Sequence, residues 1–260
     1  MIPKTIHWCW FGHGEKSALV EKCVNSWLRY CPDFKIKEWN ESNFDVTANR
    51  YVREAYENKK WAFVADYVRV YALYHEGGIY MDSDVEVVRS LDCFLPLTAF
   101  TGRDSVNGSL TGTMGSEKGG AWVKRLLDDY DDRQFVLPDG SLNLTTNVAY
   151  ADEVMKPLGL TFEDREFEVP EFVKIFKQEV FCPKSFKDRT YRITDNTYTI
   201  HHFSATWISR RIHQIDWVND HLGRVPAKIF SVLSDRPDRA LWRVLRFPFR
   251  ALRQRLPAKV

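Results

Sequence analysis

The chain has 260 residues, of which 44% are hydrophobic, 28% charged and 14% aromatic. This composition is typical of a globular protein and excludes collagen-like, low-complexity and largely disordered chains. The net charge is only +2, but residues 224–260 carry ten Lys or Arg and two Asp, which leaves residues 1–223 with a net charge of −6. An acidic body with a basic tail argues against a nucleic-acid-binding protein and for a local interaction at the tail. We therefore expect one α/β domain over residues 1–223 and a basic segment over residues 224–260.

The pattern of apolar residues predicts strands and helices in alternation. Residues 4–11 are β-branched and aromatic and end at Gly12 and Gly14, which indicates a buried strand followed by a loop. Residues 61–76 are apolar nearly all round a helix, as in buried helices, and a Gly-Gly pair ends them. Elsewhere we expect helices at 16–30, 119–130 and 145–156 and strands at 34–39, 79–88, 97–102, 109–114 and 197–203, whereas 160–195 show no clear pattern. This alternation favours an α/β fold with a mostly parallel sheet.

Two aspartates follow the Gly-Gly pair. On a strand, the i, i+2 spacing of Asp82 and Asp84 places both side chains on one face, close together. Two such carboxylates repel each other unless a cation lies between them, and oxygen ligands favour Mg²⁺ or Mn²⁺ over zinc. The pair therefore predicts a divalent-metal site, where ligand sites of α/β sheets usually lie. The competing interpretation is a solvated acidic turn.

Asp66 and Arg69 interrupt the apolar helix over 61–76. At i and i+3 they share one face, where an exposed ion pair would contribute only a few tenths of a kcal/mol. The apolar residues around them indicate burial, and a buried ion pair is costly without further partners. The hydroxyls and phosphates of a polar ligand would supply those partners, so we favour a functional pair over an internal structural one.

These features together resemble the DXD glycosyltransferases of family 32, which include bacterial capsule-sugar transferases and yeast mannosyltransferases. The glucosyltransferase domains of large clostridial toxins are similar more distantly. The shared pattern is an Asp-x-x-Arg helix, a Gly-Gly-x-Tyr and an Asp-x-Asp, which fall here on Asp66, Arg69, Gly77, Gly78, Tyr80, Asp82 and Asp84. The opening IPKTIHWCWFG and the segment IHHFSATW over 200–207 also resemble the family's first and last motifs, with Thr206 where Ser is usual.

The resemblance implies a GT-A fold, with a Rossmann-like, mostly parallel sheet flanked by helices. It also implies a retaining, metal-dependent sugar transfer. The donor is expected to be a nucleotide-diphosphate sugar, most simply a UDP-sugar, and the acceptor a hydroxyl of a glycan or a lipid-linked glycan in surface polysaccharide synthesis. In this interpretation Asp66 and Arg69 hold the sugar, with Arg69 also near the phosphates. Asp82 and Asp84 hold Mn²⁺ or Mg²⁺, with Asp82 also near the ribose.

The same resemblance assigns roles to further residues. Trp10 would stack on the nucleobase, Tyr80 would line the nucleotide pocket and Asn147 would contact the sugar. Trp207 would lie over the leaving phosphate. The alternatives are core packing for Trp10, a helix N-cap for Asn147 and simple anchoring of its segment for Trp207.

One of two neighbouring histidines is a candidate third metal ligand. His201 and His202 lie on a predicted strand and so point to opposite faces, which means that at most one reaches the metal. The family pattern favours His201, whereas toxin-like spacing to the tryptophan would suit His202.

The expected location is cytoplasmic, on the inner face of a membrane. We find no secretory signal, no apolar run of transmembrane length and no Cys-x-x-C among the five cysteines. Within residues 238–256 two stripes recur at helical spacing, one of arginines (Arg239, Arg243, Arg246, Arg250 and Arg253) and one of apolar residues (Leu241, Leu245, Phe249, Leu252 and Leu256). A cationic amphipathic helix of this kind suits an anionic membrane surface, and the alternative is a helix packed on the domain.

Two other classes of function remain open at this point. The two aspartates could serve a metal-dependent phosphohydrolase, or the chain could be a non-catalytic membrane-associated protein with a relic site. The sequence alone leaves the sugar, the acceptor, the linkage and the oligomeric state undetermined.

Overall fold

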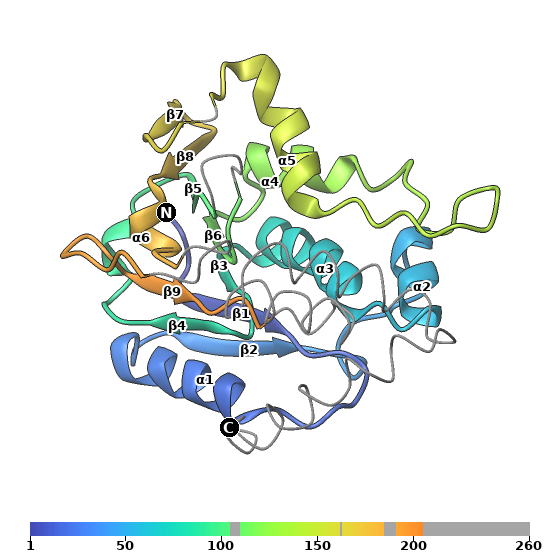
Figure 1. The fold of residues 1–260 in the computed structure, drawn as a ribbon, viewed down its shortest axis with the longest axis horizontal. Coiled ribbons are helices and arrows are strands. Elements are labelled where there is room, and N and C mark those ends of the chain that lie inside the picture. Colours follow the sequence, from blue (N-terminus) through green and yellow to red (C-terminus); the bar gives the residue numbers. More distant parts are fainter. Residues whose placement is uncertain (105–109, 162, 185–190, 205–260) are drawn as a thin grey trace, which may run out of the picture. The chain divides into compact units, whose positions relative to one another are not determined.

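A computed structural model describes residues 1–104, 110–161, 163–184 and 191–204 (Figure 1). These residues belong to one compact unit, Met1–Ser204. The predicted domain boundary at residue 223, the basic segment 224–260 and Trp207 lie outside the described residues.

Seven strands form the central sheet in the order β2-β1-β3-β6-β5-β8-β7. β1 pairs in parallel with β2 and β3, and β5 pairs in parallel with β8, while β6 and β7 run against their neighbours. Five of the seven strands therefore share one direction, which confirms the predicted α/β fold with a mostly parallel sheet. The strands are β1 (Thr5–Cys9), β2 (Lys35–Trp39), β3 (Gly78–Met81), β5 (Ala99–Gly102), β6 (Thr113–Ser116), β7 (Phe167–Val169) and β8 (Val173–Phe176).

Helices cover both faces of this sheet (Figure 1). On one side α1 contributes Val20, Cys23 and Trp27 to a buried apolar cluster. On the other side α3, α4 and α5 contribute to a second cluster. The helices are α1 (Ala18–Tyr30), α2 (Arg50–Glu57), α3 (Trp61–Glu76), α4 (Ala121–Asp128), α5 (Asn147–Met155) and α6 (Gln178–Phe181), with short 3₁₀ turns at Asp92–Phe94 and Lys156–Leu158. Among the described helices, none has the length and apolar character needed to cross a bilayer.

The connection from α3 to β3 is as tight as the Gly-Gly pair suggests. Gly77 ends the helix at φ +69°, and Gly78 follows at φ +115°. Both values lie in the left-handed region that glycine adopts without strain. A Cβ on Gly78 would also lie 2.6 Å from the carbonyl oxygen of Thr5 in β1. The glycines thus let a buried helix turn directly into a central strand, which fixes the residues that follow β3.

The predicted strand over 79–88 is wrong in one respect that matters for the site. The structure divides it into β3 and β4 (Val85–Val87), and β4 pairs with β9 (Thr199–His201) outside the central sheet. The segment 82–84 between them is a turn, closed by the N–H of Val85 donating to the carbonyl of Asp82 at 3.0 Å. The two aspartates therefore approach each other across a turn and not along one face of a strand.

Candidate functional site

Asp82, Asp84 and His201 meet at the turn after β3. Nε2 of His201 lies 3.3 Å from Oδ1 of Asp84 and 3.9 Å from Oδ2 of Asp82. The register of the small sheet causes this meeting, because Val85 of β4 lies opposite His201 of β9. The structure thus brings the two predicted acids and one predicted histidine to a common point.

Asp84 is buried, and both of its carboxylate oxygens have partners. Its Oδ2 accepts a hydrogen bond from the N–H of Ser204 at 2.7 Å, and its Oδ1 faces His201. Burial alone would raise the pKa of the Asp84 carboxyl, but the His201 imidazole and the Ser204 N–H lower it below its ordinary range. Burial likewise would lower the pKa of His201, yet the Asp84 carboxylate raises it well above the ordinary value. The two groups therefore hold each other in place, and a cation held through Nε2 of His201 would take the position of the proton between them.

Arg69 joins the turn to α3. Its Nη2 lies 2.8 Å from Oδ1 of Asp66 and 3.1 Å from Oδ1 of Asp82. Its guanidinium also lies over the ring of Tyr80, 4.7 Å from the centroid, and the Tyr80 hydroxyl donates to Oδ1 of Asp82 at 3.2 Å. Tyr80 is itself buried, so the contact of this side chain with Asp82 is through its hydroxyl. The predicted Asp-x-x-Arg helix and the Asp-x-Asp turn are thus one connected network.

The Asp66 end of this network is surrounded by N–H donors. Burial raises the pKa of Asp66 to about 6, although Arg69 and the backbone N–H of Asn147 act in the opposite direction. Asn147 is the first residue of α5, whose N-cap is Thr146, so the alternative N-cap role is wrong. Among the buried nitrogen atoms of the described residues that have no hydrogen-bond partner are Nδ2 of Asn147, Nε of Arg69 and Nη1 of Arg133. These three buried donors therefore have hydrogen-bonding capacity that the described residues leave unused.

Arg133 is a component that sequence reasoning missed. It pairs with Asp129 and lies over the rings of Tyr130 and Tyr150, at 4.4 and 3.1 Å. Tyr130 packs in turn on Tyr67 of α3. The loop after α4 shows no periodicity, so only the three-dimensional arrangement could place this side chain near Asp66.

His202 points away from the turn. Its Nε2 lies 2.9 Å from Oε2 of Glu86, which also accepts from Lys22 at 2.7 Å. The opposite orientation of the two histidines follows from their places on a strand, and the β4–β9 register selects His201 to face Asp82 and Asp84.

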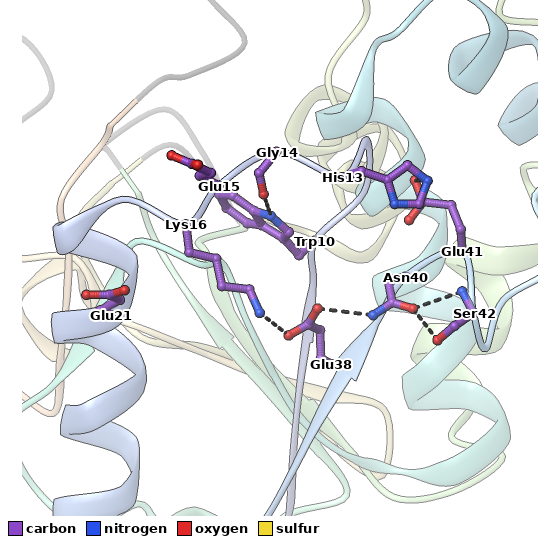
Figure 2. A pocket seen from close by; sticks show the side chains of 10 residues that line it. All are labelled: Trp10, His13, Gly14, Glu15, Lys16, Glu21, Glu38, Asn40, Glu41 and Ser42. Atoms are coloured by element: carbon purple, nitrogen blue, oxygen red, sulfur yellow. Dashed lines mark hydrogen bonds and ion pairs between the residues drawn. The ribbon is translucent and has the colours of Figure 1, made fainter.

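Trp10 lines an open pocket of about 730 Å³ beyond the carboxyl ends of β1 and β2 (Figure 2). Its indole N–H donates to the carbonyl of Gly14 at 2.7 Å, which fixes the half-buried ring beside the loop. Lys16 pairs with Glu38 at 2.5 Å on the same wall. The remaining lining residues are His13, Gly14, Glu15, Glu21, Asn40, Glu41 and Ser42. Because β1 lies between β2 and β3, this pocket and the Asp82 turn share one edge of the sheet.

The donor set at the turn suits a divalent cation. Ligands about 2.1 Å from an octahedral ion lie about 3 Å from one another, close to the spacing of His201 and Asp84. Within the described ranges, no three His, Cys, Asp or Glu side chains already have the spacing of a complete protein site. Mg²⁺-type ions are normally held by one or two carboxylates and completed by substrate phosphates and water. The residues therefore fit an ion that arrives with a phosphate-bearing ligand.

Part of the chain is similar to a known protein family. Residues 17–101 match the family model described as "Glycosyltransferase sugar-binding region containing DXD motif". The match includes Asp66, Arg69, Asp82 and Asp84, so residues 17–101 are similar to a glycosyltransferase region of the DXD type, in agreement with the resemblance seen in the sequence.

The relatives are fungal proteins. The chain is 33% identical over 133 residues to inositol phosphoceramide mannosyltransferase 3 of Schizosaccharomyces pombe, covering 48% of this chain and 36% of that protein. It is 24% identical over 244 residues to inositol phosphoceramide mannosyltransferase 2 of the same yeast, covering 86% and 64%. It is 34% identical over 131 residues to mannosyl phosphorylinositol ceramide synthase SUR1 of Saccharomyces cerevisiae, covering 45% and 31%. The chain thus spans between about a third and two thirds of the length of these relatives.

Two solved glycosyltransferases are similar in structure. PaToxG glycosyltransferase has a TM-score of 0.38 at 17% identity, over 49% of this chain and 59% of that one. A glycosyltransferase involved in glycosylation of the major capsid of PBCV-1 has a TM-score of 0.46 at 12% identity, over 78% and 95%.

Proposed function

We propose that the chain is a retaining glycosyltransferase that moves a sugar from a nucleotide-diphosphate sugar to an acceptor hydroxyl. The observation that carries this proposal is the meeting of Asp82, Asp84 and His201 with Arg69 at the carboxyl edge of the sheet. Asp82, Asp84 and Arg69 lie within the segment that matches the DXD family model, whereas His201 lies outside it. A pair of acids alone would serve many metal enzymes, but acids joined to an Asp-x-x-Arg helix match the family pattern.

The proposed metal ligands are Asp82, Asp84 and His201. When bound, Mn²⁺ or Mg²⁺ would neutralise charge on the diphosphate leaving group. The Arg69 guanidinium would neutralise the same charge. Its guanidinium is buried and already balanced by Asp66 and Asp82, and its Nε is free to meet a phosphate oxygen. A buried, fixed cation stabilises developing charge without reorganising at the moment of reaction.

The nucleoside would occupy the pocket lined by Trp10. The indole offers an apolar face for base stacking, and a carboxylate is offered by Glu38, near the end of β2, or by Glu41, beyond it. In sheets of this kind an acid at that place hydrogen-bonds ribose hydroxyls. The diphosphate would then extend along the sheet edge toward Asp82.

The sugar would lie at the Asp66 end of the network. Asp66 accepts hydrogen bonds from sugar hydroxyls, and the free N–H groups of Asn147 and Arg69 donate to them. In a retaining transfer the acceptor hydroxyl attacks from the side of the leaving group, and a phosphate oxygen takes its proton. No side-chain nucleophile is then required.

The relatives suggest the substrates to test first. Two are named as inositol phosphoceramide mannosyltransferases and the third as a mannosyl phosphorylinositol ceramide synthase. We therefore propose a hexose donor, tested as UDP- and GDP-sugars, and a glycan or lipid-linked acceptor at a membrane surface. Surface polysaccharide synthesis remains the biological role that the capsule-type resemblance suggests.

The test is turnover of nucleotide-sugars by the full chain, with Mn²⁺ and with EDTA. Asp82→Ala and Asp84→Ala are each expected to lose at least about a hundredfold in turnover, because each removes a fixed charge from the site. Glu86→Gln is the matched control, since Glu86 follows the same turn but binds Lys22 and His202. Unchanged turnover in EDTA, or cleavage of generic phosphodiesters in place of nucleotide-sugars, would overturn the proposal.

A further inference from the structure

Gly112 faces the carboxylate of Asp82 from the neighbouring strand. It immediately precedes β6, which runs antiparallel to β3 with Met81 opposite Thr113. The N–H of Asp82 donates to the carbonyl of Gly112 at 2.8 Å. The pairing of the two strands therefore continues by one residue beyond the sheet and places Gly112 against the first acid of the turn.

The space beside Gly112 is filled by that acid. A Cβ at Gly112 would lie 2.7 Å from Oδ2 of Asp82, 3.0 Å from Cγ2 of Val85 and 3.2 Å from Cβ of Asp82. Real Cβ atoms essentially never approach another heavy atom within 3.0 Å. The φ angle of Gly112 is not positive, so the backbone there accepts any residue. Glycine is needed at this position for room and not for conformation.

Asp82 cannot easily move aside. Its Oδ1 is held by Nη2 of Arg69 at 3.1 Å and by the hydroxyl of Tyr80 at 3.2 Å. Rotation of the carboxylate away from an added methyl group would break one or both contacts. It would also change the direction in which Oδ2 faces His201.

We propose that Gly112 is a positioning residue for the metal site. Because Gly112 has no side chain, Oδ2 of Asp82 can occupy the space beside it. This oxygen, Asp84 and His201 then face one point. This inference rests on the proposed function, because it assumes that Asp82 binds the ion. It adds a residue that acts only through Asp82 and touches no substrate.

Gly115 supplies a matched control three residues along the same segment. It too lacks a positive φ, but a Cβ there would lie 2.3 Å from Cε1 of Phe100 in the apolar core. Gly115→Ala therefore strains the same strand without touching the turn. A purely structural effect on β6 would appear in both variants, whereas an effect on the ion would appear only in Gly112→Ala.

The experiment is a titration of the full chain with Mn²⁺ in the presence of UDP or GDP, in which the electron spin resonance signal reports free Mn²⁺. Gly112→Ala is expected to bind Mn²⁺ about 10- to 100-fold more weakly than wild type, as for other residues that orient metal ligands. Gly115→Ala should keep wild-type affinity while its melting temperature falls. The concentration of Mn²⁺ giving half-maximal turnover should rise in Gly112→Ala by a similar factor.

The outcomes separate the two proposals. If wild type binds no Mn²⁺ with either nucleotide, the proposed function fails. If wild type binds Mn²⁺ and folded Gly112→Ala binds it equally well, only the role of Gly112 fails. Should Gly112→Ala not fold, Val85→Ala is added to relieve the contact with Cγ2, and the double variant is compared with Val85→Ala alone.

Discussion

His7 shows how one buried side chain can be assigned a single protonation state. Its Nε2 lies 2.8 Å from the carbonyl oxygen of Gly77, which can only accept, so Nε2 carries the hydrogen. The indole N–H of Trp39 donates to Nδ1 at 3.1 Å, so Nδ1 is unprotonated. The neutral imidazole therefore ties β1 to the end of α3 and to β2. Burial lowers the pKa of His7 below its ordinary value, against the raising effect of Gly77.

Because His7 is neutral in the folded chain, we expect the folded protein to lose stability in acid. The unfolded chain takes up a proton at His7 that the folded chain refuses, so the free energy of unfolding falls as the pH drops below about 6.5. His7→Gln keeps a donor and an acceptor but cannot titrate. We expect urea unfolding at about pH 7.5 and about pH 5.5 to show a smaller loss of stability for the variant than for wild type. Equal losses would mean that His7 does not titrate on unfolding.

Kinetic measurements can distinguish the two possible roles of Trp10, which are base stacking and core packing. Stacking on a base contributes about 1–3 kcal/mol, so Trp10→Ala should raise the KM for the nucleotide-sugar roughly 5- to 150-fold. Trp10→Phe should recover most of the affinity, and kcat should change little in either variant. A lower melting temperature with an unchanged KM would instead support the core-packing interpretation.

The sequence identified the acids of the site but not their geometry. Asp82 and Asp84 stand out because a carboxylate pair after a Gly-Gly ending is unusual, and the structure places them together. The choice between His201 and His202 depends on the pairing of β4 with β9, which joins segments more than 100 residues apart. Gly112 and Arg133 gave no signal, because the space around a glycine and the packing of a loop arginine arise only in the folded chain.

At the scale of elements, α2 depends on one buried carboxylate. Oε2 of Glu54 accepts hydrogen bonds from the N–H groups of Phe135 and Val136, both at 2.9 Å, and Oε1 accepts from Arg50 at 2.7 Å. Burial would raise the pKa of Glu54, but these donors lower it below its ordinary value. The helix is thereby joined to the loop that follows α4, more than 70 residues later.

Glu54→Ala would leave two inward-facing N–H groups without partners. Each such group costs about 1–3 kcal/mol, so we expect the free energy of unfolding to fall by about 2–4 kcal/mol. Arg50→Ala is the control, because it removes only a half-exposed ion pair worth less than about 1 kcal/mol. Urea unfolding at pH 7 measures both values, and similar small losses would show that the loop does not depend on Glu54.

The elements that were predicted well are those whose signal is local. α1 has clear apolar periodicity, whereas α3 and β1 are apolar almost throughout. The three elements have clear ends at Ser17, Gly77 and Gly12. The eight-residue α2 was missed because its contact with a distant loop supplies stability that its own sequence does not show. The segment 160–195 contains β7, β8 and α6. The strands β7 and β8 complete one edge of the sheet, and all three elements are too short to show a pattern of alternating apolar and polar residues.

At the scale of the whole molecule, charge is divided along the chain. Residues 1–223 carry a net charge of −6 and residues 224–260 a net charge of +8. An anionic membrane repels the first part and attracts the second, so binding through the tail would orient the molecule. Lipid-linked acceptors lie at such a surface. The tail is outside the described residues, and this prediction depends on its sequence alone.

The test keeps the full chain and removes only the charge of the arginine stripe, by changing Arg239, Arg243, Arg246, Arg250 and Arg253 to Gln. Each basic residue near an anionic surface contributes about 1 kcal/mol, so five together should largely abolish pelleting with phosphatidylserine-containing liposomes. Wild-type binding should weaken with added salt, because ions screen these contacts, and should be slight on neutral phosphatidylcholine liposomes. The variant should keep its nucleotide-sugar turnover on a soluble acceptor, which separates membrane binding from catalysis. If variant and wild type pellet equally, the arginines are not membrane ligands, and the alternative of a helix packed on the domain gains support.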